Sequence, residues 1–133
     1  MNIKSDEKTI NKPIEKVYSI FEDLSRFADM IPEDKRQNLT FTQDSIAGSM
    51  QGMPMGITIV NREPYSLVQC TQSEGCMMQF NFDLKLDKID DNSCKAQFVL
   101  DMEVPFMLKM MLEPKMKEAV KQMSDQFAEA LNK

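Results

Sequence analysis

Residues 78–102 read MQFNFDLKLDKIDDNSCKAQFVLDM, and apolar and polar side chains alternate along both halves of this stretch. Because successive side chains of a strand point to opposite faces, each half is predicted to be a strand with one apolar face. The polar run Asp90-Asp91-Asn92 between them predicts a turn. Folding the hairpin near Asp90 brings the two apolar faces to the same side of the sheet. The predicted cross-strand pairs are Leu84 with Ala96, Phe82 with Phe98, Phe80 with Leu100, and Met78 with Met102.

Shorter elements are predicted before this hairpin. Residues 2–10 are expected to form a first strand, with Ile3, Ser5, Glu7 and Thr9 on one face. Pro13 is tolerated in a first helical turn, and the apolar stripe after it predicts a helix: Ile14, Val17, Tyr18, Phe21 and Leu24. Ser25 is expected to cap a short second helix that ends at Pro32. From residue 38 the period changes to two, which predicts strands near residues 39–42, 46–50, 57–60 and 66–71.

The last quarter of the chain is predicted to be helical. Residues 106–112 are apolar nearly all round, and Pro114 is expected to kink or restart the helix. Beyond it the apolar residues narrow to one stripe: Met116, Val120, Met123, Phe127 and Leu131. A long antiparallel sheet with one apolar face needs a cover, which this helix can provide. The expected fold class is α+β, with a curved antiparallel sheet of about seven strands around a long C-terminal helix and two short helices after the first strand.

Three segments carry a family resemblance. Residues 12–25 read KPIEKVYSIFEDLS, Ile31-Pro32 follows the short second helix, and residues 104–107 read VPFM before the long helix. In this order, over essentially the whole chain, they resemble the helix-grip fold of START-like, Bet v 1-like and polyketide cyclase-like proteins (the SRPBCC superfamily), in a small bacterial-type form. The resemblance implies a single helix-grip domain over residues 1–133 and relatives that mostly bind or carry lipids, sterols or polyketides. Some relatives cyclise or hydrate such ligands, others act on partner proteins, and the resemblance transfers no catalytic residue.

Composition excludes several classes of function. The chain has 133 residues and a formal net charge of −5, which argues against nucleic acid and anionic membrane surfaces as partners. It has no histidine, which excludes histidine as a general base, as the partner of a serine or cysteine nucleophile, and as a metal ligand. No segment approaches the ~20 consecutive apolar residues of a membrane span, and no signal peptide is recognisable. The three cysteines have no metal-like spacing and are expected to be reduced thiols of a cytoplasmic protein.

The candidate ligand site lies on the predicted apolar faces. Methionine has a flexible, polarizable side chain, so the 13 methionines fit either an adaptable core or the lining of a deformable pocket. Arg26 and Arg36 flank the short second helix and are candidate contacts for a ligand head group. A Cu(I) site at Met50, Met53 and Met55 is a further alternative, although no metal, cofactor or catalytic residue is predicted. The predicted cavity lining is Met55, Met78, Phe80, Phe82, Phe98, Met102, Phe106, Met110 and Met111.

Three functions stay open at this point. The first is binding or carriage of a small apolar ligand, such as a lipid, sterol-like or polyketide-like molecule, between the sheet and the C-terminal helix. The second is a protein-interaction module without a ligand. The third is a cyclase or dehydratase acting on an aromatic or polyketide-like substrate, which would need a polar group with a tuned pKa inside the cavity. A homodimer is compatible with all three.

Overall fold

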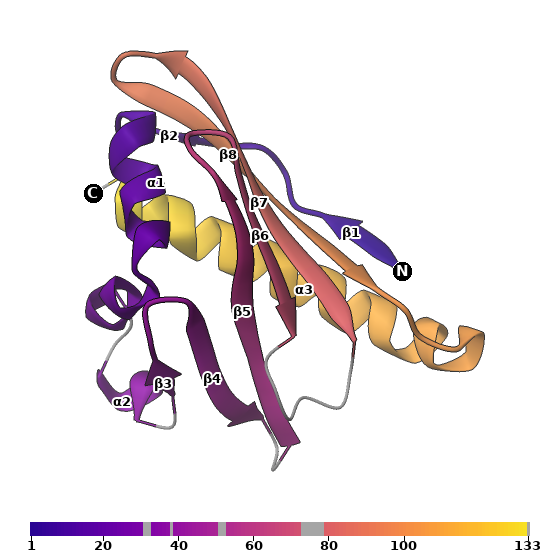
Figure 1. The fold of residues 1–133 in the computed structure, drawn as a ribbon. Helices are drawn as coiled ribbons and strands as arrows, with labels where there is room; N and C mark the ends of the chain where they lie inside the picture. Colours follow the sequence, from indigo (N-terminus) through magenta and orange to yellow (C-terminus); the bar gives the residue numbers. More distant parts are fainter. Residues whose placement is uncertain (31–32, 38, 51–52, 73–78, 133) are drawn as a thin grey trace.

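The fold is seen in a computed structural model that describes residues 1–30, 33–37, 39–50, 53–72 and 79–132 (Figure 1). The strands are β1 (Asn2–Lys4), β2 (Lys8–Ile10), β3 (Thr40–Phe41), β4 (Ser45–Met50), β5 (Met53–Glu63), β6 (Leu67–Gln72), β7 (Phe80–Asp90) and β8 (Ser93–Met102). The helices are α1 (Ile14–Glu22), the short 3-10 helix η1 (Leu24–Met30), α2 (Glu33–Arg36) and α3 (Phe106–Leu131).

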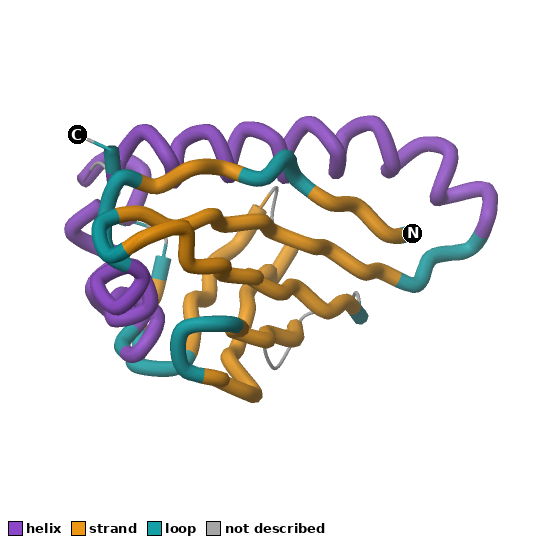
Figure 2. Tube along the Cα trace, turned by 90° about the horizontal axis from the view of Figure 1, so that it is seen from above, coloured by secondary structure: helices purple, strands orange, loops and turns teal. Residues whose placement is uncertain are grey.

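The described strands form one antiparallel sheet of eight strands, one more than the approximate number predicted. Its order is β1-β8-β7-β6-β5-β4-β3, and β2 also pairs with β8. The helix α3 contacts β1, β2 and β8, and Figure 2 shows the rest of the sheet turning away from it. At the end of the sheet near the C-terminus of α3 lie α1 and η1 (Figures 1 and 2). The predicted helix-grip fold, a curved antiparallel sheet with a long C-terminal helix, is confirmed.

The first strand differs from its prediction because it is interrupted. Lys4 pairs with Val99 and Lys8 with Ala96, so four steps along the first segment match three along β8. This extra residue is a bulge, and it allows Ile3 and Ile10, which have opposite parity, both to be buried. Ser5, between β1 and β2, is buried, and its Oγ accepts a hydrogen bond from the backbone N–H of Phe98 at 3.0 Å.

The central hairpin folds as predicted, but its register differs by two residues. Leu84 pairs with Phe98, Phe82 with Leu100 and Phe80 with Met102, and the register shifts between Lys88 and Asp90. A slip of two residues leaves every side chain on its original face, so alternation alone cannot distinguish the two registers. The turn geometry at Asp90 sets the register instead, because the Asp90 Oδ1 accepts hydrogen bonds from Asn92 and Ser93.

The helices also differ in detail from their predictions. Asp23, rather than Ser25, supplies the cap of η1: its Oδ1 accepts hydrogen bonds from the N–H and the hydroxyl of Ser25, at 3.0 and 2.6 Å. The predicted stop at Pro32 lies outside the described residues. Pro114 does not end α3, which runs as one helix from Phe106 to Leu131.

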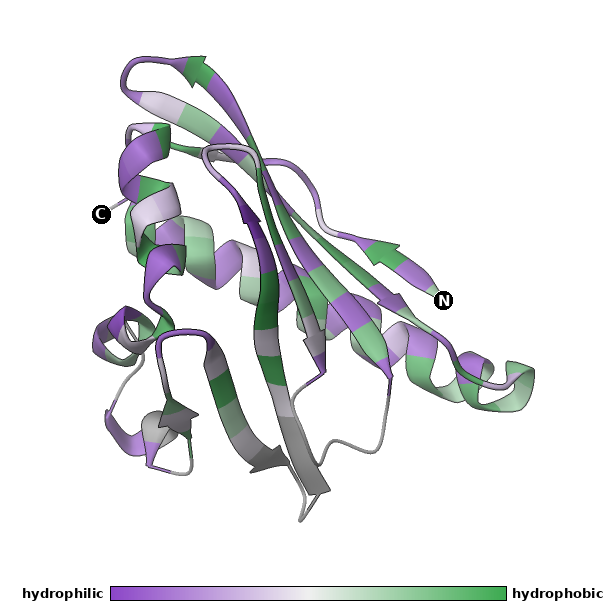
Figure 3. Cartoon of the chain, in the orientation of Figure 1, coloured by the Kyte–Doolittle hydropathy of each residue, from purple (hydrophilic) through white to green (hydrophobic). Residues whose placement is uncertain are grey.

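Burial along α3 is uneven. Its buried residues, Val120, Ser124 and Phe127, all lie in the second half, where the helix packs on the core shared by α1 and the sheet. The first turns extend beyond the sheet, and Figure 3 shows apolar residues there. Met107 is 81% exposed. Within the described part of the chain, no helix combines the length and hydropathy needed to cross a membrane.

Candidate functional site

An apolar pocket of about 280 Å³ lies between the sheet and the second half of α3. The wall formed by the sheet comes from strands β4, β5, β6, β7 and β8. The side chains follow the two-residue period of the strands, so those that share a strand point to the same face. The described residues of the sheet that line the pocket are Ile46, Ile57, Val68, Cys70, Phe82, Leu84 and Phe98.

Two helical segments form the rest of the pocket wall. Phe21, Leu24 and Phe27 come from α1 and η1, and Met123, Gln126, Phe127 and Ala130 come from α3. Met123, Gln126 and Ala130 are also exposed to solvent, so they mark the mouth of the pocket.

Aromatic contacts join the three sides of the pocket. Phe82 stacks on Phe98, with ring centroids 5.5 Å apart. Phe98 meets Phe127 of α3 edge to face at 5.3 Å, and Phe127 lies 5.9 Å from Phe21 of α1. Such pairs add about 0.5–1.5 kcal/mol each beyond the burial of their area. The pocket is therefore bounded by packed rings from β7, β8, α1 and α3.

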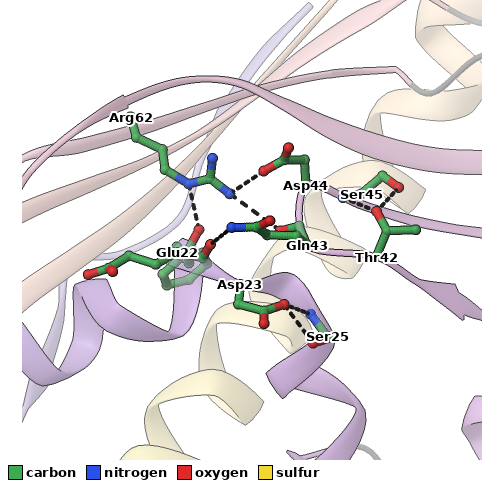
Figure 4. A network of polar contacts seen from close by, with 9 residues as sticks. Glu22, Asp23, Ser25, Thr42, Gln43, Asp44, Ser45 and Arg62 are labelled. Carbon is green, nitrogen blue, oxygen red and sulfur yellow. Dashed lines mark hydrogen bonds and ion pairs between the residues drawn. The ribbon is translucent and has the colours of Figure 1, made fainter.

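A polar network outside the pocket holds its helical wall (Figure 4). Arg62 of β5 donates through Nε to the carbonyl oxygen of Phe21 at 2.8 Å, and its Nη2 pairs with Asp44 Oδ1 at 2.8 Å. Nη2 also donates to the Gln43 carbonyl at 3.3 Å, and the same carbonyl accepts from the backbone N–H of Leu24. Because Phe21 and Leu24 line the pocket, these contacts fix the position of the α1–η1 wall against the sheet.

The described lining is uncharged at neutral pH. Burial, with a smaller contribution from the nearby Asp83 carboxylate, raises the pKa of the Cys70 thiol to about 12, so the thiol stays protonated. Gln126 has the only amide side chain among the described lining residues, and none of these residues is an aspartate, glutamate, lysine or arginine. The arrangement suits desolvation of an apolar molecule, with one polar group available at the mouth.

The pocket contains two of the residues predicted to line it, Phe82 and Phe98. Phe80 packs against the core and Met102 is buried, but neither is among the lining residues, because their pair lies near the end of the hairpin beyond the pocket. The prediction for Met78, and for the side chain of Met55, lies outside the described residues.

Three other predicted lining residues are placed away from the pocket. Phe106, Met110 and Met111 are 74%, 67% and 69% exposed. The prediction assumes that the most apolar part of the helix covers the sheet. Instead, the narrower stripe after Pro114 does so, since the first turns of α3 extend beyond the strands (Figure 2).

Of the two candidate head-group contacts, Arg26 is not among the described lining residues. Arg26 is exposed, and its Nη1 donates to the carbonyl oxygen of Ser19 at 3.0 Å. The side chain of Arg36 lies outside the described residues, as do those of Met50, Met53 and Met55, where a Cu(I) site is an alternative. No group of histidine, cysteine, aspartate or glutamate side chains able to hold a metal is found among the described residues.

Most of the lining is absent from the predicted set. The apolar stripes of the two helices contain Phe21, Leu24, Met123 and Phe127, so periodicity is a signal for their burial. Periodicity cannot show which part of a buried stripe faces a cavity. Gln126 carries no such signal, because it lies beside the stripe and its place at the mouth depends on how α3 crosses the sheet.

Solved structures with similar folds cover nearly the whole chain. A START superfamily protein from Mycobacterium smegmatis is 13% identical, with a TM-score of 0.67 over 98% of this chain and 94% of that chain. Norcoclaurine synthase from Thalictrum flavum, in complex with dopamine and hydroxybenzaldehyde, is 12% identical, with a TM-score of 0.75 over 99% and 84%. Aha1 from Colwellia psychrerythraea, solved as a dimer, is 16% identical, with a TM-score of 0.68 over 99% and 96%. At these identities the likeness establishes the fold.

No curated protein matches the chain significantly in sequence. The model of the CoxG family, which is described as a subunit of carbon monoxide dehydrogenase, matches residues 7–133, nearly the whole chain. Together with the solved structures, this match supports the predicted START-like and Bet v 1-like type of fold. The chain belongs to the CoxG family.

Proposed function

We propose that this protein binds a small apolar ligand in the pocket between the sheet and the second half of α3. The observation that carries the proposal is an apolar pocket of about 280 Å³ whose described lining is uncharged and whose mouth is open at Gln126 and Ala130. Its volume is just below the usual range of ligand pockets, about 300–1,000 Å³. Burial of apolar ligand surface supplies roughly 25 cal/mol per Å², before the entropy lost on binding is subtracted.

The proposed ligand classes are lipid, sterol-like and polyketide-like molecules small enough for this volume, or the apolar part of a larger one. A head-group contact at Arg26 or Arg36 stays a prediction. A cytoplasmic location belongs to the same proposal, and the free buried thiols of Cys70 and Cys94 are compatible with it. A cyclase or dehydratase would need a titratable side chain in the pocket, and Cys70 is the one that the described lining offers.

The proposal is tested with N-phenylnaphthylamine, an uncharged apolar dye whose fluorescence rises when it leaves water. Wild-type protein should bind one dye per chain saturably. Ala130→Trp places an indole at the mouth and should weaken binding at least about tenfold, which corresponds to about 1.4 kcal/mol. The matched control is Ala119→Trp, an exposed alanine of α3 outside the lining, which should bind the dye as the wild type does. No saturable binding, or equal binding by both variants, would contradict the proposal.

A second candidate function is contact with a protein partner through the exposed start of α3. Phe106, Met107, Met110 and Met111 are each more than two-thirds exposed, and apolar surface of this kind is typical of contact sites. The family description names carbon monoxide dehydrogenase, so its other subunits are the partners to test first.

Co-purification from the source cells tests this second candidate. Wild-type protein should carry subunits of that enzyme with it, and a variant with Phe106→Ser and Met110→Ser should not. Ala130→Trp should retain the subunits, because it alters the pocket alone. Equal recovery with both variants would remove the exposed start of α3 as the contact.

A further inference from the structure

Among the described lining residues, one amide side chain lies at the mouth of the pocket without a hydrogen-bond partner. Gln126 lines the pocket and is exposed, and its side chain has no hydrogen-bond partner among the described residues. Gln122, one turn earlier on α3, differs: its Nε2 donates to Glu118 Oε1 at 3.1 Å, and it does not line the pocket. An amide can both donate and accept a hydrogen bond, so Gln126 can bind a hydroxyl or a carbonyl group of a ligand.

The surroundings of this amide do not suit an anionic group. The described lining contains no lysine or arginine. Of the arginines near the helical wall, Arg62 is paired with Asp44, and Arg26 donates to the Ser19 carbonyl outside the lining. A carboxylate or phosphate held beside Gln126 would lose part of its hydration without gaining a counter-charge. A neutral hydroxyl or carbonyl would exchange its water for the amide at little net cost.

We propose that Gln126 makes the pocket selective for an uncharged ligand with an apolar body and one hydrogen-bonding group at the end nearest the mouth. This inference rests on the proposed function, and it adds a ligand class and a specificity-determining residue. The apolar body lies against the aromatic rings of Phe82, Phe98 and Phe127, while Gln126 binds the polar end. A ligand that is charged in its buried part, or apolar throughout, fits the site less well.

Competition against bound N-phenylnaphthylamine tests the inference with three probes of equal chain length: decyl alcohol, decane and decanoate. The measurement is made at about pH 8, where a carboxylic acid in water is ionised. The ratio of decyl alcohol affinity to decane affinity should fall about fivefold in Gln126→Leu, since a net hydrogen bond is worth about 1 kcal/mol. Gln122→Leu, the matched control, should leave this ratio unchanged. Decanoate should bind the wild type at least about tenfold more weakly than decyl alcohol.

The outcomes separate this inference from the function on which it rests. If all three probes displace the dye and Gln126→Leu leaves the ratio unchanged, the pocket binds apolar ligands but the selectivity by Gln126 is wrong. Decanoate binding as tightly as decyl alcohol would also overturn the inference, and would favour a head-group contact at Arg26 or Arg36. If the dye itself does not bind saturably, both the inference and the proposed function fail.

Discussion

Phe98 combines two roles at the scale of a single residue, because it belongs to both the core and the pocket wall. It is 5% exposed and contacts both Phe82 and Phe127. Phe98→Ala should lower the free energy of unfolding by about 3–5 kcal/mol, the usual cost of removing a buried aromatic ring. Urea unfolding at constant pH measures the change. Phe106→Ala removes an exposed ring and should cost about 0.5 kcal/mol or less, so equal losses in the two variants would contradict the described burial.

Cys70 provides a residue-scale test of how dry the pocket is. Its thiol is buried and its raised pKa, about 12, leaves very little thiolate at about pH 8. Because the thiolate is the nucleophile, Cys70 in the folded protein should react with iodoacetamide far more slowly than in urea-unfolded protein. Mass spectrometry of the peptide that contains Cys70 measures both rates. Comparable rates in the two states would show that water and reagent reach the thiol freely.

At the scale of elements, Arg62 connects the helical wall to the sheet. Arg62→Met removes the ion pair with Asp44 and the hydrogen bonds to the carbonyls of Phe21 and Gln43. The expected loss of stability is about 1.5–3 kcal/mol, typical of hydrogen bonds to a charged group. The control is Lys88→Met, which breaks a highly exposed ion pair with Asp91 and should cost about 0.5 kcal/mol or less. Chemical denaturation distinguishes the two, and similar small losses would mean that the wall is held by apolar packing alone.

Asp83 on β7 is expected to make the stability of the protein depend on pH. Partial burial is the main cause of the raised pKa of its carboxyl group, and the nearby Asp101 charge acts in the same direction. The folded state therefore holds this proton more tightly than the unfolded state. The resulting contribution to stability is fully present below the unfolded pKa of about 3.9, and it is lost as the pH rises through the folded pKa.

Asp83→Asn cannot ionise, so it should be more stable than the wild type at about pH 7, and this advantage should disappear below about pH 3.9. Thermal unfolding across this pH range measures the difference. Asp87→Asn, on the exposed face of the same strand, should change stability by about 0.5 kcal/mol or less at neutral pH. A variant of Asp83 that is less stable than the wild type at neutral pH would show that the hydrogen bonds from Gln69 and Cys70 outweigh the burial of the charge.

At the scale of the whole molecule, the sequence predicts which elements form more reliably than how they meet. The alternation in residues 78–102 and the stripes of α1 and α3 predict the right strands and helices, because these periods depend on local geometry. The register of β7 and β8 depends on the turn at Asp90, and the bulge between β1 and β2 involves Ser5. The period of apolar residues indicates neither feature. The position of the pocket depends on which half of α3 crosses the sheet, so Phe82 and Phe98 are predicted while Gln126 is not.

Methyl NMR of the methionines tests the central claim, that an apolar ligand binds beside the second half of α3. Met123 lines the pocket, whereas Met107 and Met111 lie on the exposed first turns of the same helix. On titration with N-phenylnaphthylamine, the ring current of the dye should shift the Met123 methyl resonance saturably and leave the other two unchanged. Saturable shifts of Met107 and Met111 without a shift of Met123 would contradict the claim and place the apolar site at the exposed start of α3.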